Sequence, residues 1–81
     1  MDKTDVRKRV AGYNQFLKLV RRGKAVKVYL ASDADTFFKI GVKSELSGKQ
    51  NLKLDEHYTA KQLAEMAGVE VPTAVITEIN G

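Results

Sequence analysis

The sequence predicts a single α/β domain in which helices cover both faces of a small β-sheet. Segments with a helical spacing of apolar residues alternate with segments that are typical of strands, which is the pattern of this fold class. The strand predicted at residues 25–31 is apolar on both faces from Val28 to Ala31, as expected for a central strand covered on two sides. With 81 residues, of which 43% are hydrophobic and 30% charged, the chain fits one globular domain over residues 1–81.

Two helices are predicted before this strand. Thr4 or Asp5 caps a short first helix that runs through Val10. Asn14 caps a second helix, which runs to about Arg22 and stops at Gly23.

The elements after the strand follow from caps and periodicity. They are predicted, in chain order, as a helix over Thr36–Leu46 with Phe38, Val42 and Leu46 in register, a short strand at Asn51–Leu54, a helix over Ala60–Ala67 between Thr59 and Gly68, and a strand over Pro72–Ile79.

Positive charge is concentrated in the first 30 residues. They hold nine Lys and Arg against two Asp, a net charge of +7, whereas residues 31–81 hold five basic and eight acidic side chains, a net charge of −3. Such an asymmetry favours an anionic partner. Taken by itself, the charge distribution is explained equally well by a basic face that is exposed only to solvent.

A polar stripe follows one face of the helix predicted at residues 14–22. Asn14, Lys18 and Arg22 are spaced i, i+4 and i+8, so they share one helical face. Asn14 and Gln15 offer a paired donor and acceptor for a base edge, while Lys and Arg supply charge for phosphates. The stripe predicts a contact with RNA or DNA. Apolar residues on the other side anchor the helix to a core: Phe16, Leu17 and Val20.

The same residues also have structural interpretations. Asn14 is a common N-cap residue, and Lys18 and Arg22 suit a solvated face near a helix C-terminus. Val69 and Val71 fit the entry to the last strand.

Three short motifs follow one another along the chain: Gly12-Tyr13-Asn14-Gln15 with Lys18, Ala31 with Asp33-Ala34-Asp35, and Leu63 to Gly68 with Val69-Glu70-Val71. They resemble the G-x-N-E/Q-x-x-K, A-x-D-A-D and L-G-x-x-x-G-[IV]-[DE]-V segments of the ribosomal protein L-seven-Ae family, which binds RNA kink-turns. Their order and spacing extend the resemblance over about residues 4 to 80, and it is closest to a small bacterial-type member.

The resemblance implies a three-layer α-β-α sandwich around a small mixed four-stranded sheet, with an extra strand near Arg9 to Ala11. It implies a basic, non-enzymatic ribonucleoprotein component that stabilises the bent form of a kink-turn. The partner is a structured RNA of ribosomal or riboswitch type, bound by a monomer. The residues implied to contact RNA are Gly12, Tyr13, Asn14, Gln15, Lys18, Arg22, Val69, Glu70 and Val71.

In the family, the Asn, the Glu or Gln and the Lys of this signature read tandem sheared G·A pairs, and these positions are Asn14, Gln15 and Lys18. Arg22 is implied to meet phosphate. The segment over residues 69–71 is implied to pack on a flipped-out nucleotide.

Two alternatives stay open. One is a protein-interaction scaffold with the same fold and no RNA binding. The other is a small magnesium-dependent phosphatase in which Asp33 is the nucleophile and Asp35 the acid/base. Such enzymes need further Lys and Asp residues from later strands, and Asp35 also fits as the N-cap of a helix starting at Thr36.

We therefore expect no catalytic residue, no metal and no cofactor. The chain has no cysteine, and His57 is its only histidine, so an ordinary zinc site cannot be completed. No apolar run approaches the roughly 20 residues of a membrane span, and the N-terminus lacks the apolar core of a signal peptide. These features favour a cytoplasmic protein without a membrane partner.

Overall fold

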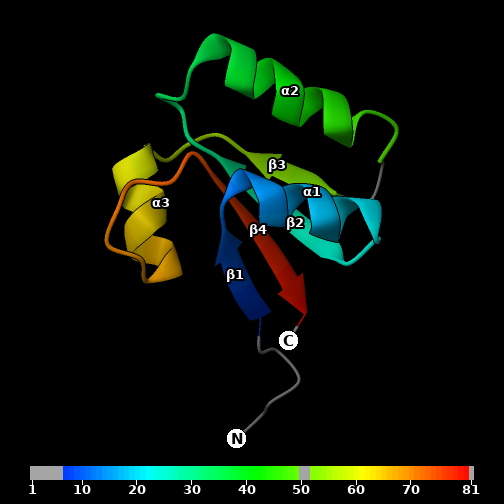
Figure 1. Cartoon of the computed structure of the whole chain (residues 1–81), viewed down its shortest axis with the longest axis horizontal. Coiled ribbons are helices and arrows are strands. Elements are labelled where there is room, and N and C mark those ends of the chain that lie inside the picture. The colour runs from blue at the N-terminus through cyan, green and yellow to red at the C-terminus, as the bar shows by residue number, and fades with distance from the viewer. Residues whose placement is uncertain (1–6, 50–51, 81) are drawn as a thin grey trace, which may run out of the picture.

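The computed structural model describes residues 7–49 and 52–80, and in this part of the chain four strands alternate with three helices (Figure 1). In chain order these are β1 (Arg7–Ala11), α1 (Tyr13–Arg21), β2 (Ala25–Leu30), α2 (Thr36–Leu46), β3 (Lys53–Asp55), α3 (Ala60–Ala67) and β4 (Val75–Asn80).

The strands form one mixed sheet in the order β1-β4-β2-β3. β4 pairs antiparallel with both β1 and β2, and β3 pairs parallel with β2. The expected small mixed four-stranded sheet is therefore confirmed, with β4 and β2 as its central strands. No helix in the described residues is long and apolar enough to cross a membrane.

Each face of the sheet carries its own apolar cluster. Successive side chains of a strand point to opposite faces, so β2 places Val28 and Leu30 in one cluster and Tyr29 in the other, together with Ala31, which directly follows the strand. The first cluster includes Phe16 and Val20 of α1, Val42 of α2 and Val75 of β4, and the second includes Leu63 of α3 and Ile76 of β4. Helices α1 and α2 thus cover one face and α3 the other, which confirms the α-β-α sandwich.

The predicted ends of α2 and α3 are confirmed. The Asp35 side chain caps α2 by accepting hydrogen bonds from the first-turn backbone. Thr59 and Gln62 form a capping box at the start of α3. Gly68 closes α3 in the left-handed conformation with φ 73°.

The pattern-based prediction of a helix through Val10 is wrong for the described residues. Residues 7–11 form β1 and pair in register with residues 76–80 of β4. The strand expected near Arg9 to Ala11 from the family resemblance is confirmed. Pairing with a distant strand overrides the weak local signal. Thr4, Asp5 and Val6 lie outside the described residues.

The interpretation of Asn14 as the N-cap of α1 is wrong. The N-cap is Gly12, without a side-chain hydrogen bond, and the helix begins at Tyr13. Gly12 has φ 108° and ψ 148°, a conformation that is open essentially only to glycine. The chain therefore passes from β1 into α1 earlier than expected, and Asn14 lies in the first helical turn.

The predicted bounds of the last two strands also need correction. β4 begins at Val75 rather than Pro72, because proline lacks a backbone N–H for the ladder. The Thr73 N–H instead donates to the carbonyl of Ala60, at the start of α3. β3 begins at Lys53, and Asn51 lies outside the described residues.

Candidate nucleic-acid interface

The start of α1 and the loop before β4 meet at one end of the sheet. The backbone N–H of Gly12 donates to the carbonyl oxygen of Val75 at 3.1 Å. The loop over residues 69–74 runs directly into Val75, and Figure 1 shows it at the same end as the start of α1. The structure thus joins the start of α1 to the end of the loop that carries residues 69–71, the second segment that the sequence indicated for RNA contact.

The polar stripe of α1 faces outward. Phe16 and Val20 are buried in the core, so the exposed side chains of Asn14, Lys18 and Arg22 lie on the opposite side of the helix. A shallow hollow of about 460 Å³ runs along this side, lined by Asn14, Leu17, Lys18, Arg21 and Arg22. Gln15 is also exposed.

The N-terminus of α1 has no side-chain cap, unlike those of α2 and α3. The Phe16 N–H donates to the Gly12 carbonyl, but within residues 7–49 and 52–80 the N–H groups of Tyr13, Asn14 and Gln15 have no hydrogen-bond partner. Unpaired N–H groups at a helix start carry partial positive charge. This end of α1 is therefore suited to an anionic or carbonyl-bearing ligand.

The Tyr13 side chain contributes to packing rather than to the open surface. Its half-buried ring lies 5.7 Å from the ring of Phe16 and 5.3 Å from that of Phe38, measured between centroids. The ring thus joins α1 to α2, and the backbone of Tyr13 remains at the helix start.

The cations of α1 are not equivalent. The Arg21 guanidinium donates from Nε and Nη2 to the two carboxylate oxygens of Glu45 at 3.3 and 2.8 Å, which ties α1 to α2. This hydrogen-bonded pair raises the pKa of Arg21 and lowers the pKa of Glu45. In the described part of the chain, Lys18 and Arg22 form no ion pair. No local sequence signal distinguishes Arg21 from Arg22, because the difference depends on how α2 packs.

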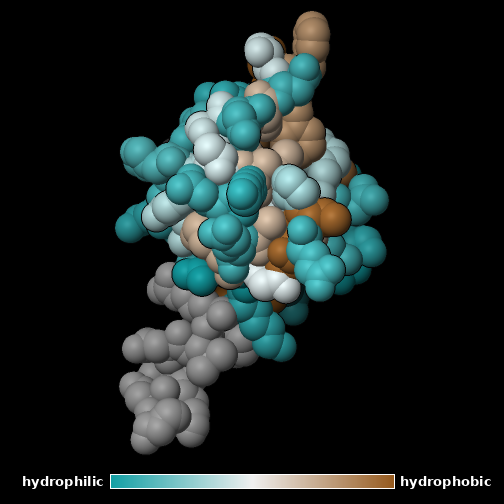
Figure 2. Space-filling view, turned by 90° about the vertical axis from the view of Figure 1, so that its left-hand side faces the viewer, coloured by the Kyte–Doolittle hydropathy of each residue, from teal (hydrophilic) through white to brown (hydrophobic). Residues whose placement is uncertain are grey.

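The apolar residues of the loop before β4 are partly open to solvent. Val71 is 69% exposed and Val69 is 38% exposed, with the exposed Glu70 between them. Figure 2 views the molecule from the side on which α3 lies in Figure 1, and hydrophobic patches interrupt its largely hydrophilic surface.

The two carboxylates of the phosphatase alternative both serve as helix caps. Asp33 Oδ1 accepts the backbone N–H of Ala60 at 2.9 Å, at the start of α3. Asp35 Oδ2 accepts the N–H groups of Phe37 and Phe38 at the start of α2. In the described ranges no three His, Asp or Glu side chains are placed to share a metal ion. These contacts support the capping interpretation of Asp35, and they give Asp33 a capping role that the sequence did not indicate.

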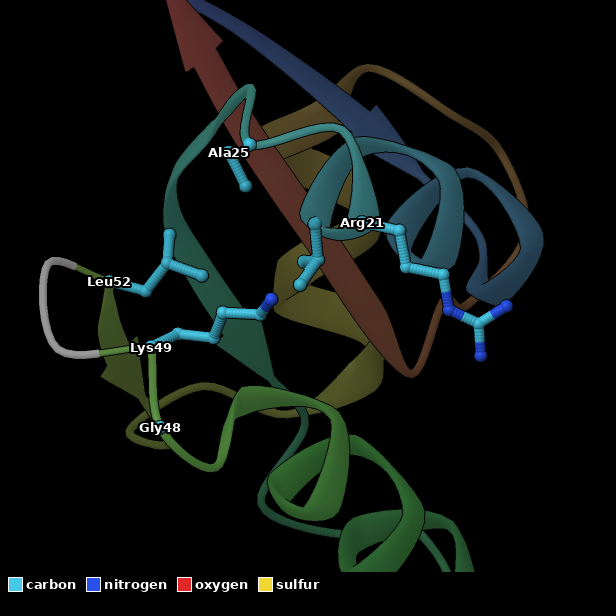
Figure 3. A pocket seen from close by; sticks show the side chains of 7 residues that line it. Arg21, Ala25, Gly48, Lys49 and Leu52 are labelled. Carbon is cyan, nitrogen blue, oxygen red and sulfur yellow. The ribbon is translucent and has the colours of Figure 1, made fainter.

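A second hollow lies near the other end of α1. It has a volume of about 330 Å³ and is lined by Val20, Arg21, Gly23, Ala25, Gly48, Lys49 and Leu52. Lys49 reaches into it, whereas the Arg21 guanidinium points away (Figure 3). None of the residues predicted to contact RNA lines it.

A mixed sheet between two helical layers, with a cationic helix that starts beside the loop before the last strand, defines a small α-β-α protein with an exposed basic helix face. The chain belongs to the ribosomal protein L7Ae/L30e/S12e/Gadd45 family, whose model matches residues 2–81. Among proteins of curated function, none matches this chain.

Two solved structures illustrate the likeness. A protein with unknown function from Bacillus halodurans C has a TM-score of 0.78 and 22% identity, and the match covers 91% of this chain and 72% of that one. The Giardia lamblia 15.5kD RNA binding protein has a TM-score of 0.71 and 31% identity, with 91% of this chain covered. This chain spans 61% of the length of the Giardia protein.

Proposed function

We propose that this protein binds kink-turn RNA and stabilises its bent form. Membership of the family and the likeness to an RNA binding protein from Giardia support RNA as the partner. The observation that carries the proposal is the uncapped start of the cationic helix α1, which the Gly12–Val75 hydrogen bond holds against the loop before β4.

The start of α1 offers the donors that a kink-turn requires. RNA duplexes hide their major-groove edges, so proteins read irregular places where guanine edges are exposed. The Asn14 and Gln15 side chains pair with base edges, and Lys18 reaches guanine O6 and N7 of the sheared G·A pairs. The free N–H groups of the first turn and Arg22 bind phosphates across the bend.

The loop before β4 completes this surface. Val69 and Val71 present apolar side chains to an unstacked sugar and base, and Glu70 lies between them. A single copy of the protein holds both segments, so we propose that a monomer binds one kink-turn. Binding bent RNA more tightly than extended RNA shifts the RNA population toward the bent form.

An electrophoretic mobility shift titration tests this proposal. The RNA contains a kink-turn, and the control RNA has its tandem G·A pairs replaced by Watson–Crick pairs at the same length. Because each good base-edge contact gives about 1–3 kcal/mol of discrimination, we expect at least roughly tenfold weaker binding of the control. Equal binding of both RNAs would exclude specific recognition.

A further inference from the structure

Phe37 is an exposed aromatic residue that forms no ring contact with another described residue. It lies in the first turn of α2 and is 82% exposed, more than any other large hydrophobic side chain in the described residues. The Asp35 cap fixes this turn by accepting the N–H groups of Phe37 and Phe38 at 2.9 and 3.3 Å. Phe38 turns inward to pack against the core, so Phe37 is held pointing outward.

Helices α1 and α2 lie side by side in the same direction, and three contacts show it. At their starts, the rings of Tyr13 and Phe38 are 5.3 Å apart. A Cβ at Gly41, one turn further along α2, would lie 3.8 Å from the Tyr13 hydroxyl. At their ends, Arg21 and Glu45 form an ion pair at 2.8 Å.

These contacts place Phe37 at the end of α2 that lies beside the start of α1. Phe37, Gly41 and Glu45 are spaced i, i+4 and i+8, so they form one row on α2. Gly41 and Glu45 of this row face α1, next to its first and last residues. Phe37 continues the row by four residues, a rise of about 6 Å, which brings it past the Tyr13 hydroxyl, to the end of α2 beside the open start of α1.

We propose that Phe37 stacks on an unpaired base of the RNA held at the start of α1. The inference rests on the proposed function and adds α2 to the RNA-binding surface. Aromatic rings stack on unstacked bases of bound RNA, and the neighbouring α1 surface carries the free cations Lys18 and Arg22. On α2 only Phe37 and Ile40 are exposed large apolar side chains. The apolar area of two side chains is far smaller than the roughly 800 Å² that each partner buries in a stable protein interface. One ring on a cationic surface suits a base rather than a protein.

A tryptophan at this position reports stacking directly. The chain contains no tryptophan, so Phe37→Trp introduces a single tryptophan, whose emission can be excited separately from that of the tyrosines. We expect its fluorescence to be quenched on addition of kink-turn RNA. In a series of RNAs, each unpaired nucleotide of the kink-turn is replaced in turn by an abasic site. The quench should disappear only in the RNA that lacks the base stacked on the introduced tryptophan.

Affinity measurements complete the test. Phe37→Ala should weaken binding of kink-turn RNA roughly 5- to 150-fold, the range measured for loss of one base–aromatic stack. Ile40→Ala is the matched control, since Ile40 is 57% exposed on the same helix but lies outside the row that faces α1. Thermal unfolding of each variant shows that the fold is intact.

The outcomes separate this inference from the proposed function. If the wild type discriminates between kink-turn RNA and the Watson–Crick control, but Phe37→Ala binds kink-turn RNA as tightly as the wild type does, the proposed function stands and the stacking inference is overturned. An equal loss in Phe37→Ala and Ile40→Ala, or a quench that survives every abasic substitution, also overturns it, and points to apolar contact of another kind, such as with a protein. Failure of the wild type to discriminate overturns both.

Discussion

The backbone N–H of Gly12 and the carbonyl oxygen of Val75 are joined by a hydrogen bond of 3.1 Å, directly beyond the last paired residues of β1 and β4, Ala11 and Ile76. The two residues lie far apart in the sequence. Their contact fixes the start of α1 relative to the loop that enters β4. A ligand that touches both segments therefore meets a surface supported by the sheet rather than two independent loops.

Substitution of the exposed stripe should affect RNA binding without affecting stability. We expect Asn14→Ala and Lys18→Ala each to weaken binding of kink-turn RNA by about 1–3 kcal/mol. Their Tm values should match the wild type, because both side chains are exposed and neither forms an ion pair in the described residues. Lys53→Ala is the control, since it removes the same charge from an exposed position on β3. A lower Tm with unchanged RNA affinity would show that the two residues are structural.

Arg22 should contribute to RNA affinity by contacting a phosphate. Its contribution should therefore depend on the salt concentration rather than on the RNA sequence. For Arg22→Ala we expect similar weakening for RNAs of different sequence, and a slope of log K against log salt that is shallower by about 0.7–0.9. Titrations at several salt concentrations give this slope. A salt-independent affinity in the wild type would favour the protein-interaction scaffold instead.

Two glycines should respond to alanine in opposite directions. Gly12→Ala introduces a side chain where φ is 108°, and although space is open there, the backbone strain should cost about 1–3 kcal/mol of unfolding free energy. Gly41→Ala lies within α2 and meets only ordinary contact with Tyr13, so it should gain up to about 1 kcal/mol from helix propensity. Urea denaturation measures both. An unchanged unfolding free energy in Gly12→Ala would show that the backbone of the turn into α1 changes its conformation to accept the side chain.

Local signals explain which elements could be predicted from the sequence. The caps of α2 and α3 depend on neighbours in the chain, and Asp35, Thr59 and Gly68 indicated them correctly. β1 could not be found by pattern, because its stability comes from pairing with β4 at the other end of the chain. Its position followed only from the family resemblance.

The candidate site shows the same limit. Helical periodicity correctly placed Lys18 and Arg22 on the outer face of α1. It could not show that Arg21 is bound to Glu45, or that Phe37 rather than Phe38 remains exposed, because both facts depend on how α2 packs against α1. The contacts that the predicted residues make with RNA remain predictions.

The buried hydroxyl of Thr77 predicts a stabilising substitution. Thr77 is fully buried, and its Oγ1 has no hydrogen-bond partner among the residues that the structure describes. Thr77→Val keeps the shape and removes the unpaired polar atom, so the unfolding free energy should rise by about 1 kcal/mol. Thr73→Val is the matched control, because the Thr73 hydroxyl donates to the Val75 carbonyl at 3.1 Å and its loss should be destabilising. Chemical denaturation of both variants checks the prediction, and a destabilised Thr77→Val would show that the hydroxyl is bonded.

The Arg21–Glu45 ion pair should stabilise the contact between α1 and α2 only while Glu45 is ionised. The hydrogen bond from Arg21 holds the pKa of Glu45 below its ordinary value of 4.5 in the folded protein. A group whose folded pKa is lowered contributes its stability above the unfolded pKa, and loses that contribution as pH falls through the folded pKa. Glu45→Gln should therefore have a lower Tm than the wild type at pH 7, and the difference should vanish in strong acid.

The measurement is a series of thermal unfolding curves from neutral to acidic pH for the wild type and Glu45→Gln. Glu65→Gln serves as the control, since Glu65 is exposed on α3 and forms no ion pair in the described part of the chain. It should show little Tm difference at any pH. Added salt should narrow the Glu45→Gln difference at pH 7, because the pair is solvent-exposed and is screened. A difference that persists below the folded pKa of Glu45 would mean that its carboxyl stabilises the helix pair by packing or neutral hydrogen bonding rather than by charge.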